Sequence, residues 1–568
     1  MIPVVWLSLN PTTPGRGYWD QGMLESLFSH ELWDAPHLPE FTHTESLEGI
    51  TDGAIIVFPA RAQVHYIDQL NELIKPLNWV ILMLTGDEEA VFPFEKLSHP
   101  NMKLWVMSPR RQERYNNVRF LGTGYPPQAR EYLTQIDMPE RDNDWYFAGQ
   151  VTHERRMQLG QQLELLLEQD EVEGYYLPTP GFTQGLDPVD YYREMARAKI
   201  AYAPSGPETP DSFRLFEALE AGCVPMADTR VQSSKNNDDF GDDYWQFFFG
   251  EIVPFPVIRN YSDLIPYTMD ALDQWKKLSN RIFAWWMKMK RKMAHDLVDD
   301  IRDVRGLDPC KDQRRTVTVL MPSSVIPAHP STEMLEKCIA DIRLHLPESE
   351  IILMLDGVRE EQANRVADYE EYVRRVLWMA HHKWHNVLPV VFEEHMHQAK
   401  MTRVCLDLVK TDTILFVEHD APLCPDFTLP WDDMITTIRM GEAYTIRFHH
   451  EALVLPDHDH MMFDKETQIV NNVPMRRTMQ WSQRPHLSNT FYYKHMLKTY
   501  FNPESKTMIE DVMHGRVHSV CEDNGLDGWY IHRLWMYTPE GNIKRSYHLD
   551  GRGEDPKYDM DIRPVENG

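Results

Sequence analysis

Hydrophobic and polar positions alternate in blocks along the first part of the chain. Short runs that are almost wholly apolar are followed by longer stretches in which apolar residues recur every three or four positions. The short runs predict strands buried on both faces, and the longer stretches predict amphipathic helices. Strands that alternate with helices indicate a parallel sheet. We expect strands at 3–9, 53–60, 78–86 and 102–109, and helices at 20–28 and 63–77.

A second block with the same alternation begins at residue 144. Its expected strands are 144–150, 173–178, 199–205 and 223–228, and its expected helices are 154–169, 188–198 and 211–222. Two such units in tandem predict two Rossmann-like lobes, at 1–140 and 141–306, that face each other across a cleft.

One long helix is expected at Ser279–Gly306, where Trp and Met recur among basic residues and acidic residues follow. One interpretation is a helix that lies on a membrane surface. The other is a closing helix that packs its Trp and Met face on the two lobes. The acidic end favours the closing helix, because anionic lipid would repel it.

After a linker at about 307–312 the α/β pattern restarts, which predicts a third domain over 313–555 and a tail at 556–568. From about Asp432 onward the sequence is irregular and rich in His, Met and aromatic residues. The expected elements are a strand and loop at 316–330, helices at 332–347 and 400–410, and strands at 349–357 and 412–420.

Composition narrows the class of protein. The chain has 568 residues, 42% hydrophobic and 26% charged, which fits two to four globular domains. A net charge of -29 disfavours nucleic acid as a partner unless basic residues cluster locally. No stretch approaches the roughly 18 apolar residues of a membrane span. The apolar start lacks a basic leader and the six cysteines stand singly, so we expect a cytoplasmic protein, in the host cytoplasm if a phage encodes it.

The segment from Ser205 to Glu217 combines the features of a phosphate site. A strand ends before Ser205, and Asp211 or Ser212 can cap the helix that follows. The free N–H groups of a helix N-terminus suit phosphate, and Arg214 in the first turn adds a bidentate contact. Glu217, about one turn further on, can accept hydrogen bonds from ribose hydroxyls.

This segment, through Met226, resembles the signature of exostosin-type glycosyltransferases, and Tyr146–Arg156 resembles the opening of the same lobe. The resemblance implies the GT-B fold and a nucleotide-sugar donor, bound by Ser205, Ser212, Arg214 and Glu217. It also implies that Gly149, Arg155 and Arg156 lie near the donor phosphates. The first lobe would hold the acceptor. There Asp20, in a glycine-containing loop, is a candidate base, with a solvated turn as the alternative.

A second group of acids follows the apolar run 413–417, as Glu418, His419 and Asp420. With its preceding elements this segment resembles family-2-like transferases of the GT-A fold, in which Mn²⁺ or Mg²⁺ neutralises the leaving diphosphate. The resemblance implies that Asp420 binds the metal, that Glu418 binds through water or contacts the ribose, and that His419 points away and packs. It implies further donor contacts from Pro327, Asp356 and Arg403.

Two later motifs occur in the order of the same family. Glu510 and Asp511 resemble the acidic pair that supplies the base of inverting enzymes, and His548 resembles a histidine that completes the metal site. A carboxylate in that place would remove the proton of the acceptor hydroxyl as it attacks the anomeric carbon.

Each of two other groups of polar residues has two possible interpretations. The first is a zinc site or a loop that shapes the acceptor site, and its residues are Asp457, His458, Asp459 and His460. The second is a grip for an anionic or nucleic-acid acceptor, or a solvated loop and a core strand, and its residues are Arg476, Arg477 and Arg484.

Together these features predict a two-module glycosyltransferase: twin Rossmann-like GT-B lobes followed by a GT-A domain. The resemblance implies an inverting hexosyl- or pentosyltransferase that uses a UDP-sugar, with Mn²⁺ or Mg²⁺ in the GT-A module, from a bacterium or bacteriophage. The acceptor is a glycan, a hydroxymethylated base of phage DNA or a virion protein. The rival hypothesis is that one module is a nucleotide- or sugar-binding scaffold. The oligomeric state is left open.

Overall fold

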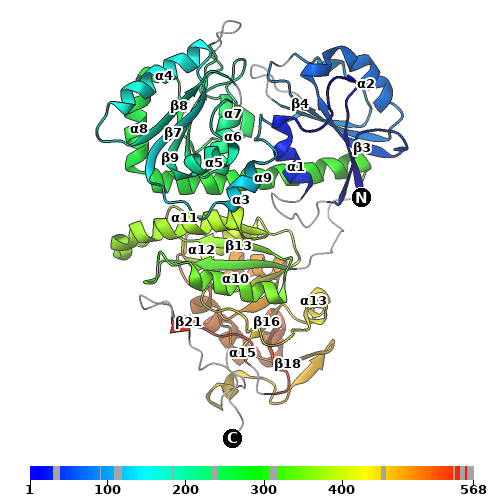
Figure 1. Ribbon diagram of the computed structural model, residues 1–568. Coiled ribbons are helices and arrows are strands. Elements are labelled where there is room, and N and C mark those ends of the chain that lie inside the picture. The colour runs from blue at the N-terminus through cyan, green and yellow to red at the C-terminus, as the bar shows by residue number, and fades with distance from the viewer. Residues whose placement is uncertain are drawn as a thin grey trace. The chain divides into compact units, whose positions relative to one another are not determined.

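The computed structural model (Figure 1) describes residues 1–29, 39–89, 91–107, 118–181, 184–232, 239–307, 317–449, 454, 456–541, 544–550 and 557–558. The chain divides into two compact units. The first contains residues 1–312 with 381–383, and the second contains 313–380 and 384–568. Of the predicted tail, only residues 557 and 558 lie within the described residues.

The first unit begins with a six-stranded, wholly parallel sheet in the order β2-β1-β3-β4-β5-β6. Successive residues of its central strands pack on opposite faces, one covered by α1 and the other by α2. The strands are β1 (Ile2–Trp6), β2 (Phe41–Thr44), β3 (Gly53–Pro59), β4 (Trp79–Thr85), β5 (Met102–Val106) and β6 (Val118–Phe120). The helices are η1 (Trp19–Gln21), α1 (Gly22–Phe28), η2 (Arg61–Tyr66), α2 (Ile67–Ile74), η3 (Phe94–Lys96) and α3 (Ala129–Gln135).

The second sheet of this unit has five parallel strands in the order β11-β10-β9-β7-β8. Its strands are β7 (Asn143–Gln150), β8 (Gly174–Thr179), β9 (Ala198–Ala203), β10 (Val224–Asp228) and β11 (Val257–Ile258). Its helices are α4 (Glu154–Leu167), α5 (Pro188–Arg197), α6 (Phe213–Glu220), α7 (Tyr244–Phe249), η4 (Tyr261–Asp263) and α8 (Leu264–Asp273). The predicted alternation of strands and helices is confirmed in both sheets.

Helix α9 (Trp275–Arg305) runs along both sheets of the first unit (Figure 1). Its second half contributes Ala294, Leu297 and Ile301 to the core beneath β1, β3 and β4. Trp286, in its first half, is buried against Phe216 of α6. The membrane-surface interpretation is therefore wrong for the Trp and Met face, which lies in the protein core, and the closing helix is confirmed.

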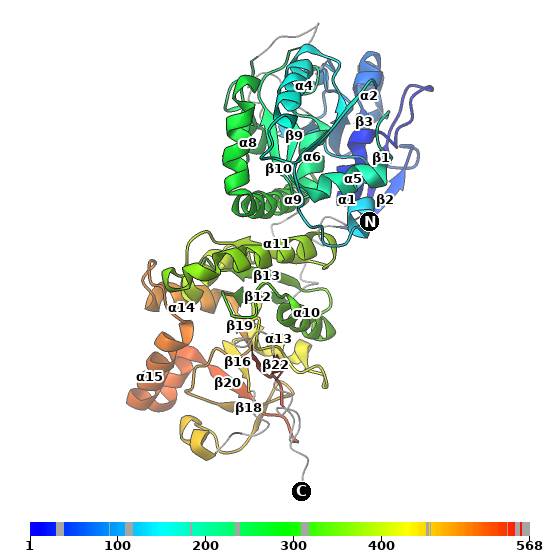
Figure 2. The same ribbon diagram turned by 60° about the vertical axis from the view of Figure 1, so that its left-hand side comes forward.

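The second unit holds one nine-stranded sheet that is parallel at one end and mixed at the other. In its parallel part, the order is β14-β13-β12-β15, and the strands are β12 (Val317–Ser323), β13 (Glu350–Leu355), β14 (Val387–Val391) and β15 (Thr413–Phe416). The helices here are α10 (Glu333–His345), η5 (Glu360–Arg365), α11 (Val366–His382) and α12 (His397–Leu406). Figure 2 shows α11 along these strands, where the Tyr372 hydroxyl lies 2.9 Å from that of Ser323 on β12.

The region after Asp432, whose sequence is irregular, completes the nine-stranded sheet of the second unit. This region adds the strands β16 (Thr445–Phe448), β17 (Gln468–Val470), β18 (Val473–Arg477), β19 (His486–Asn489) and β20 (Leu534–Tyr537), in the order β15-β19-β16-β20-β18-β17. It also forms α13 (Trp431–Arg439), η6 (Pro456–Met461), α14 (Thr490–Tyr500) and α15 (Ile509–His532), followed by the pair β21 (Leu549–Asp550) and β22 (Lys557–Tyr558). Strands of three to five residues with polar positions give too short a pattern to predict.

In the described part of the chain, no helix is long and apolar enough to cross a membrane.

Candidate functional sites

At the start of α6, the side chains of Asp211 and Ser212 bond to neighbouring segments of the first unit. The Ser212 hydroxyl donates to the Pro204 carbonyl at 2.9 Å, so this side chain closes the preceding loop and does not cap the helix. Asp211 accepts from the Thr123 N–H at 3.2 Å and from the Tyr244 hydroxyl at 3.4 Å. Ser212 is thus the N-cap residue of α6 by position, as expected, but it makes no side-chain capping hydrogen bond.

Arg214 and Gly149 fit each other closely. The Arg214 guanidinium lies across Gly149 and donates from Nη2 to the Ala148 carbonyl at 3.0 Å. A Cβ atom on Gly149 would lie 1.8 Å from Arg214 Nη2. Only glycine therefore leaves room for this arginine at the end of β7, which gives a physical reason for the glycine in the motif.

Glu217 lies one turn further along α6 and is almost completely buried. Its two carboxylate oxygens accept from the Tyr191 hydroxyl at 2.7 Å and the Tyr192 hydroxyl at 3.0 Å. Burial raises the pKa of Glu217, while Arg214 and the two tyrosine hydroxyls act against that rise. The tyrosines fix the carboxylate, and its remaining lone pairs can accept further hydroxyl groups.

These residues line a cavity of about 390 Å³. Its wall also includes Trp19 of the first lobe, whose ring meets Phe213 edge-on at 6.0 Å. Trp19 thus contributes a part of the cavity wall from the first lobe, near the point where α6 begins. Its other lining residues come from the ends of β7 and β8 and from the start of α5.

The two adjacent arginines of α4 have different environments. Arg155 forms a bidentate ion pair with Asp228 at 2.8 and 2.7 Å and lies over the Tyr261 ring at 3.8 Å. Arg156 is 8% exposed, and its Nε donates to the Ser205 carbonyl at 3.2 Å. Burial and the nearby Arg214 lower the pKa of Arg156 to about 9. Arg155 therefore serves the fold, and Arg156 is the arginine that lies close to Arg214.

Two acids of the first lobe, Asp20 and Glu88, lie close to each other. Asp20 is buried and accepts a hydrogen bond from the Gly86 N–H, and burial raises its pKa to about 6. Glu88, in the loop after β4, was missed at the sequence level. Burial, and then Asp211 and Asp20, raise the pKa of Glu88 to about 7, against the effect of Arg61 and Arg156. Its signal in the sequence was an acid just after a predicted parallel strand.

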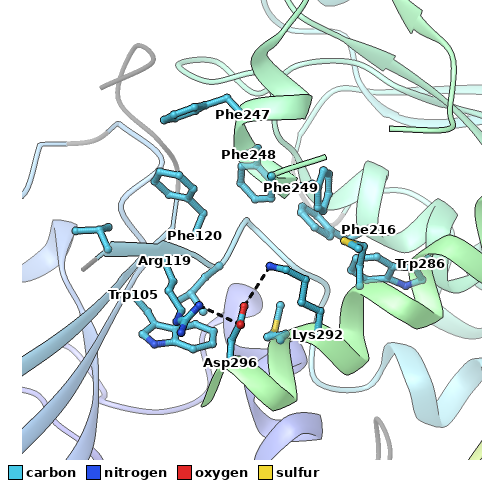
Figure 3. Close-up of a pocket in the computed structure, with 15 residues that line it drawn as sticks. Trp105, Arg119, Phe120, Phe216, Phe247, Phe248, Phe249, Trp286, Lys292 and Asp296 are labelled. Atoms are coloured by element: carbon cyan, nitrogen blue, oxygen red, sulfur yellow. Dashed lines mark hydrogen bonds and ion pairs between the residues drawn. The ribbon is translucent and has the colours of Figure 1, made fainter. Parts of the chain in front are cut away.

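A second cavity of the first unit, of about 230 Å³, is lined mainly by aromatic rings (Figure 3). Phe120 and Phe248 approach it from the two lobes, with ring centroids 6.1 Å apart. Asp296 of α9 pairs there with Arg119 at 3.0 Å and with Lys292 at 3.2 Å. Because both cations already have an anionic partner, this cavity suits a nucleotide diphosphate less well than the cavity at α6.

In the second unit, Glu418, His419 and Asp420 follow β15. Glu418 accepts from Gln398 Nε2 at 2.8 Å, and burial followed by repulsion from Asp420 raises its pKa to about 8. His419 is buried, and its Nδ1 donates to the Pro322 carbonyl of β12 at 3.1 Å. The expectation that His419 packs away from the site fits this contact, which ties the acidic loop to the neighbouring strand.

Asp420 and His548 come together across more than a hundred residues. His548 Nε2 lies 3.5 Å from Asp420 Oδ2, and the Leu549 N–H donates to the Asp420 carbonyl at 2.7 Å. Burial opposes ionisation of Asp420, but the hydrogen bond to His548 and the charges of His419 and His548 hold its pKa below the ordinary value. A carboxylate beside an imidazole is a reasonable pair of ligands for a divalent cation.

Larger metal clusters do not occur among the described residues. No group of three or more His, Cys, Asp or Glu side chains gathers there closely enough to hold a metal ion. His458, Asp459 and His460 belong to the described residues and form no such group, whereas the side chain of Asp457 lies outside the described residues.

The two candidate bases of the second unit, Glu510 and Asp511, differ in burial and in their neighbours. Glu510 is partly buried and accepts from the Gln483 N–H at 3.0 Å, and its charge acts on Glu418. Asp511 is exposed, and its charge acts on His397. Of the two acids, Glu510 is therefore the one beside the acidic loop.

Asp356 and Arg403 have structural partners. Asp356 accepts from the backbone N–H groups of Met396 at 2.6 Å and His397 at 3.1 Å, and its Oδ2 lies 2.8 Å from His395 Nδ1. It therefore holds the loop before α12. Arg403 donates to the carbonyls of Leu497 at 2.7 Å and Phe501 at 2.8 Å, which joins α12 to α14. The expected contact of these two side chains with the donor stays a prediction.

Pro327 and two of the arginines named in the sequence analysis, Arg477 and Arg484, lie in different surroundings within the second unit. Pro327 lines an open cavity of about 990 Å³ together with Arg365 and Arg375 of the neighbouring helical elements. Arg477 pairs with Asp464 at 3.0 Å and lies over Trp529, so it belongs to the packed strand. Arg484 instead lies close enough to Glu418 to lower its pKa.

Comparison with known proteins gives no family. No family model matches the chain, and no curated protein matches it. Among solved structures, S. aureus TarS 1–349 in complex with UDP-GlcNAc is similar at 14% identity, covering 41% of this chain and 58% of that chain, with a TM-score of 0.26. The mannosyltransferase PcManGT from Pyrobaculum calidifontis, in complex with GDP-Man and Mn²⁺, is similar at 11% identity, 41% and 60% coverage and a TM-score of 0.25.

The bifunctional IspDF from Campylobacter jejuni is similar at 11% identity, 41% and 52% coverage and a TM-score of 0.21. This chain thus spans less than two thirds of each of these three structures. TM-scores this low indicate nothing about the activity of this chain.

Proposed function

We propose that the chain is a nucleotide-sugar-dependent glycosyltransferase. The observation that supports this most strongly is the cavity at the start of α6. There Arg214 crosses Gly149, and Glu217 is held by two tyrosine hydroxyls. An arginine beside an uncapped helix start suits a diphosphate, and a fixed carboxylate suits ribose hydroxyls.

In this proposal residues 1–140 form an acceptor lobe and 141–306 a donor lobe, in a GT-B arrangement. Arg156, Arg214 and the loop of Ser205 and Ser212 would hold the diphosphate without a metal. The exostosin-type motifs at Tyr146–Arg156 and 212–226 support the same assignment.

Residues 313–555 would form a second, GT-A-like transferase module. Asp420 and His548 would hold Mn²⁺ or Mg²⁺, which supplies positive charge to the leaving diphosphate. Their 3.5 Å separation and the lowered pKa of Asp420 fit that role. Glu510 is favoured over Asp511 as the base, because it lies beside Glu418.

The proposal is tested by a thermal-shift screen of the full chain with UDP, GDP, UDP-glucose, UDP-galactose, UDP-GlcNAc and GDP-mannose, with Mn²⁺ or with EDTA. We expect a stabilising shift with a nucleotide sugar in EDTA, from the first module, and a further shift in Mn²⁺. Release of nucleoside diphosphate from the stabilising donor distinguishes a transferase from a binding scaffold, since transfer to water also counts as turnover. The proposal is wrong if no nucleotide shifts the transition.

One binding measurement and one transfer assay separate the acceptor classes. A gel shift with hydroxymethylated duplex DNA, read at several salt concentrations, tests a DNA acceptor. The charge of -29 disfavours that outcome. A transfer assay with glycans and with virion protein tests the other two.

A further inference from the structure

The loop after β4 brings a carboxylate, that of Glu88, close to Arg156 of the second lobe. Asp20, after β1, fixes this loop by accepting from the Gly86 N–H, and Asp20 itself is 8% exposed. Glu88 follows two residues after Gly86 and is only partly buried. Asp20 is thus engaged with the backbone, whereas Glu88 is the more accessible acid of the pair.

Glu88 lies among charges from both lobes. Arg61 stands on its own lobe and Arg156 on the other, and both are close enough to act on its carboxylate. In the part of the chain that the structure describes, no hydrogen bond reaches the Glu88 carboxylate. A partly buried carboxylate without a hydrogen-bond donor is costly, which indicates a functional reason for its position.

On the second lobe, Arg156 of α4 and Ser205 in the loop after β9 also have polar atoms without a hydrogen-bond partner among the described residues. Among the described residues, the Arg156 guanidinium makes a single hydrogen bond, from Nε to the Ser205 carbonyl. The Ser205 hydroxyl is fully buried and has no partner there. A nearly buried guanidinium with free terminal nitrogens, next to an unpaired hydroxyl, points to an anionic ligand between the lobes.

We propose that Glu88 is the catalytic base of the first unit and that Asp20 is its positioning residue. This inference rests on the proposed glycosyltransferase function and names a residue that the sequence motifs do not contain. Arg156 and Arg214 would take the leaving diphosphate while Glu88 approaches the acceptor hydroxyl from the first lobe.

The proposed step moves one proton to Glu88 and one glycosyl group to the acceptor. The acceptor O–H bond breaks and its proton passes to a Glu88 carboxylate oxygen. The electron pair of the acceptor oxygen forms the new bond to the anomeric carbon, as the bond from that carbon to the phosphate oxygen breaks. The phosphate oxygen keeps that electron pair and leaves as the nucleoside diphosphate. A base with a pKa near the operating pH serves this step best, and the pKa of Glu88 is raised to about 7.

The test uses the full chain carrying Asp420→Ala, so that turnover in EDTA reports the first unit. Release of UDP from UDP-glucose, UDP-galactose and UDP-GlcNAc is measured from pH 5 to 9, with UDP affinity measured separately by calorimetry. We expect Glu88→Gln to lower kcat about 100-fold or more and to leave UDP affinity within about threefold. Wild-type kcat/KM should rise with pH through about 7, and this limb should be absent in Glu88→Gln.

Glu95→Gln, an exposed acid on the same lobe, is the matched control and should leave both quantities unchanged. Glu88→Asp should keep the limb at a reduced rate, and Asp20→Asn should lower the rate less and shift the limb. The inference is overturned if Glu88→Gln binds UDP and keeps at least half of the rate, or if its pH limb persists. Failure of the parent protein to bind UDP would instead overturn the proposed function, and this inference with it.

Discussion

Each of the two candidate sites would have to neutralise the negative charge of a diphosphate, and they differ in the side chains that they offer for this. The first site offers cations and the second offers carboxylates. The site at α6 offers Arg156 and Arg214, and its carboxylate, Glu217, is already occupied by two tyrosine hydroxyls. The site after β15 offers Glu418 and Asp420, with Glu510 nearby. The first set can neutralise a diphosphate by itself, whereas the second would repel one unless a cation intervenes. Two sites at the ends of parallel strands can therefore neutralise the charge of a diphosphate in different ways, one with arginines and the other with a bound cation.

The largest effect should come from the acid of the second site. Asp420→Ala removes the carboxylate that would hold the cation, so Mn²⁺-dependent release of nucleotide should fall about 100-fold or more. Release measured with Mn²⁺ and with EDTA isolates this fraction. Asp426→Ala, an exposed acid of the same loop, is the control. Mn²⁺-dependent release that survives in Asp420→Ala would remove the contrast between the sites.

The next effect concerns the arginine of the first site. Arg214→Ala should weaken UDP binding in EDTA by about 1.5–3 kcal/mol, or roughly 10- to 150-fold, since a charged hydrogen bond to the diphosphate is lost. Gly149→Ala should do nearly the same, because its Cβ would occupy the position of the Arg214 guanidinium. Calorimetry with UDP measures both variants.

Arg197→Ala is the matched control, because its side chain is exposed and pairs with Asp142. An unchanged UDP affinity in both Arg214→Ala and Gly149→Ala would place the diphosphate elsewhere.

A third effect appears in stability rather than binding. Burial raises the pKa of Asp20 to about 6 from an ordinary value of 3.8, so folding favours its protonated form. That contribution is fully present below about pH 3.8 and is lost as the pH rises through about 6. Asn cannot ionise and still offers an oxygen to the Gly86 N–H. Asp20→Asn should therefore gain stability relative to the parent between pH 4 and 7, by about 2 kcal/mol.

Thermal unfolding checks this, following the transition that UDP shifts in EDTA. Asp68→Asn, an exposed acid of α2, should show no such pH dependence. A stability difference for Asp20→Asn that stays constant with pH would show that Asp20 is ionised throughout, and the first lobe would then present a permanent anion to its site.

Much of the fold of the first unit follows from the sequence, because its strands are buried on both faces and its helices are amphipathic. The strand from Trp79 to Thr85 and the helix from Glu154 to Leu167 are recognisable from their patterns alone. The region after Asp432 is not, since its strands are short and its helix α15 is interrupted at Gly525, which has a φ of 58°. Its strand order also depends on pairings between distant residues.

The sites were only partly predictable, for a related reason. Arg214 and Glu217 lie one turn apart on a single helix, so their joint position follows from local geometry. Arg155 and Arg156 are adjacent and indistinguishable in sequence, and only the fold gives the first to Asp228 and leaves the second near Arg214. Glu88 acquires its neighbours from the loop after β1 and from the other lobe, and no local pattern specifies them.

The smallest effect should come from Glu217, and it tests what the first site recognises. The two tyrosine hydroxyls leave the carboxylate with unused lone pairs, which would accept from ribose. Glu217→Gln should weaken UDP binding by about 1 kcal/mol, or roughly fivefold. It should weaken 2′-deoxy-UDP less, so the preference for ribose shrinks. Tyr191→Phe removes one hydroxyl that orients the carboxylate and should have a weaker effect in the same direction. If Glu217→Gln weakens both nucleotides equally, the carboxylate supports the pocket without touching the ribose, and the first site would recognise little beyond the diphosphate.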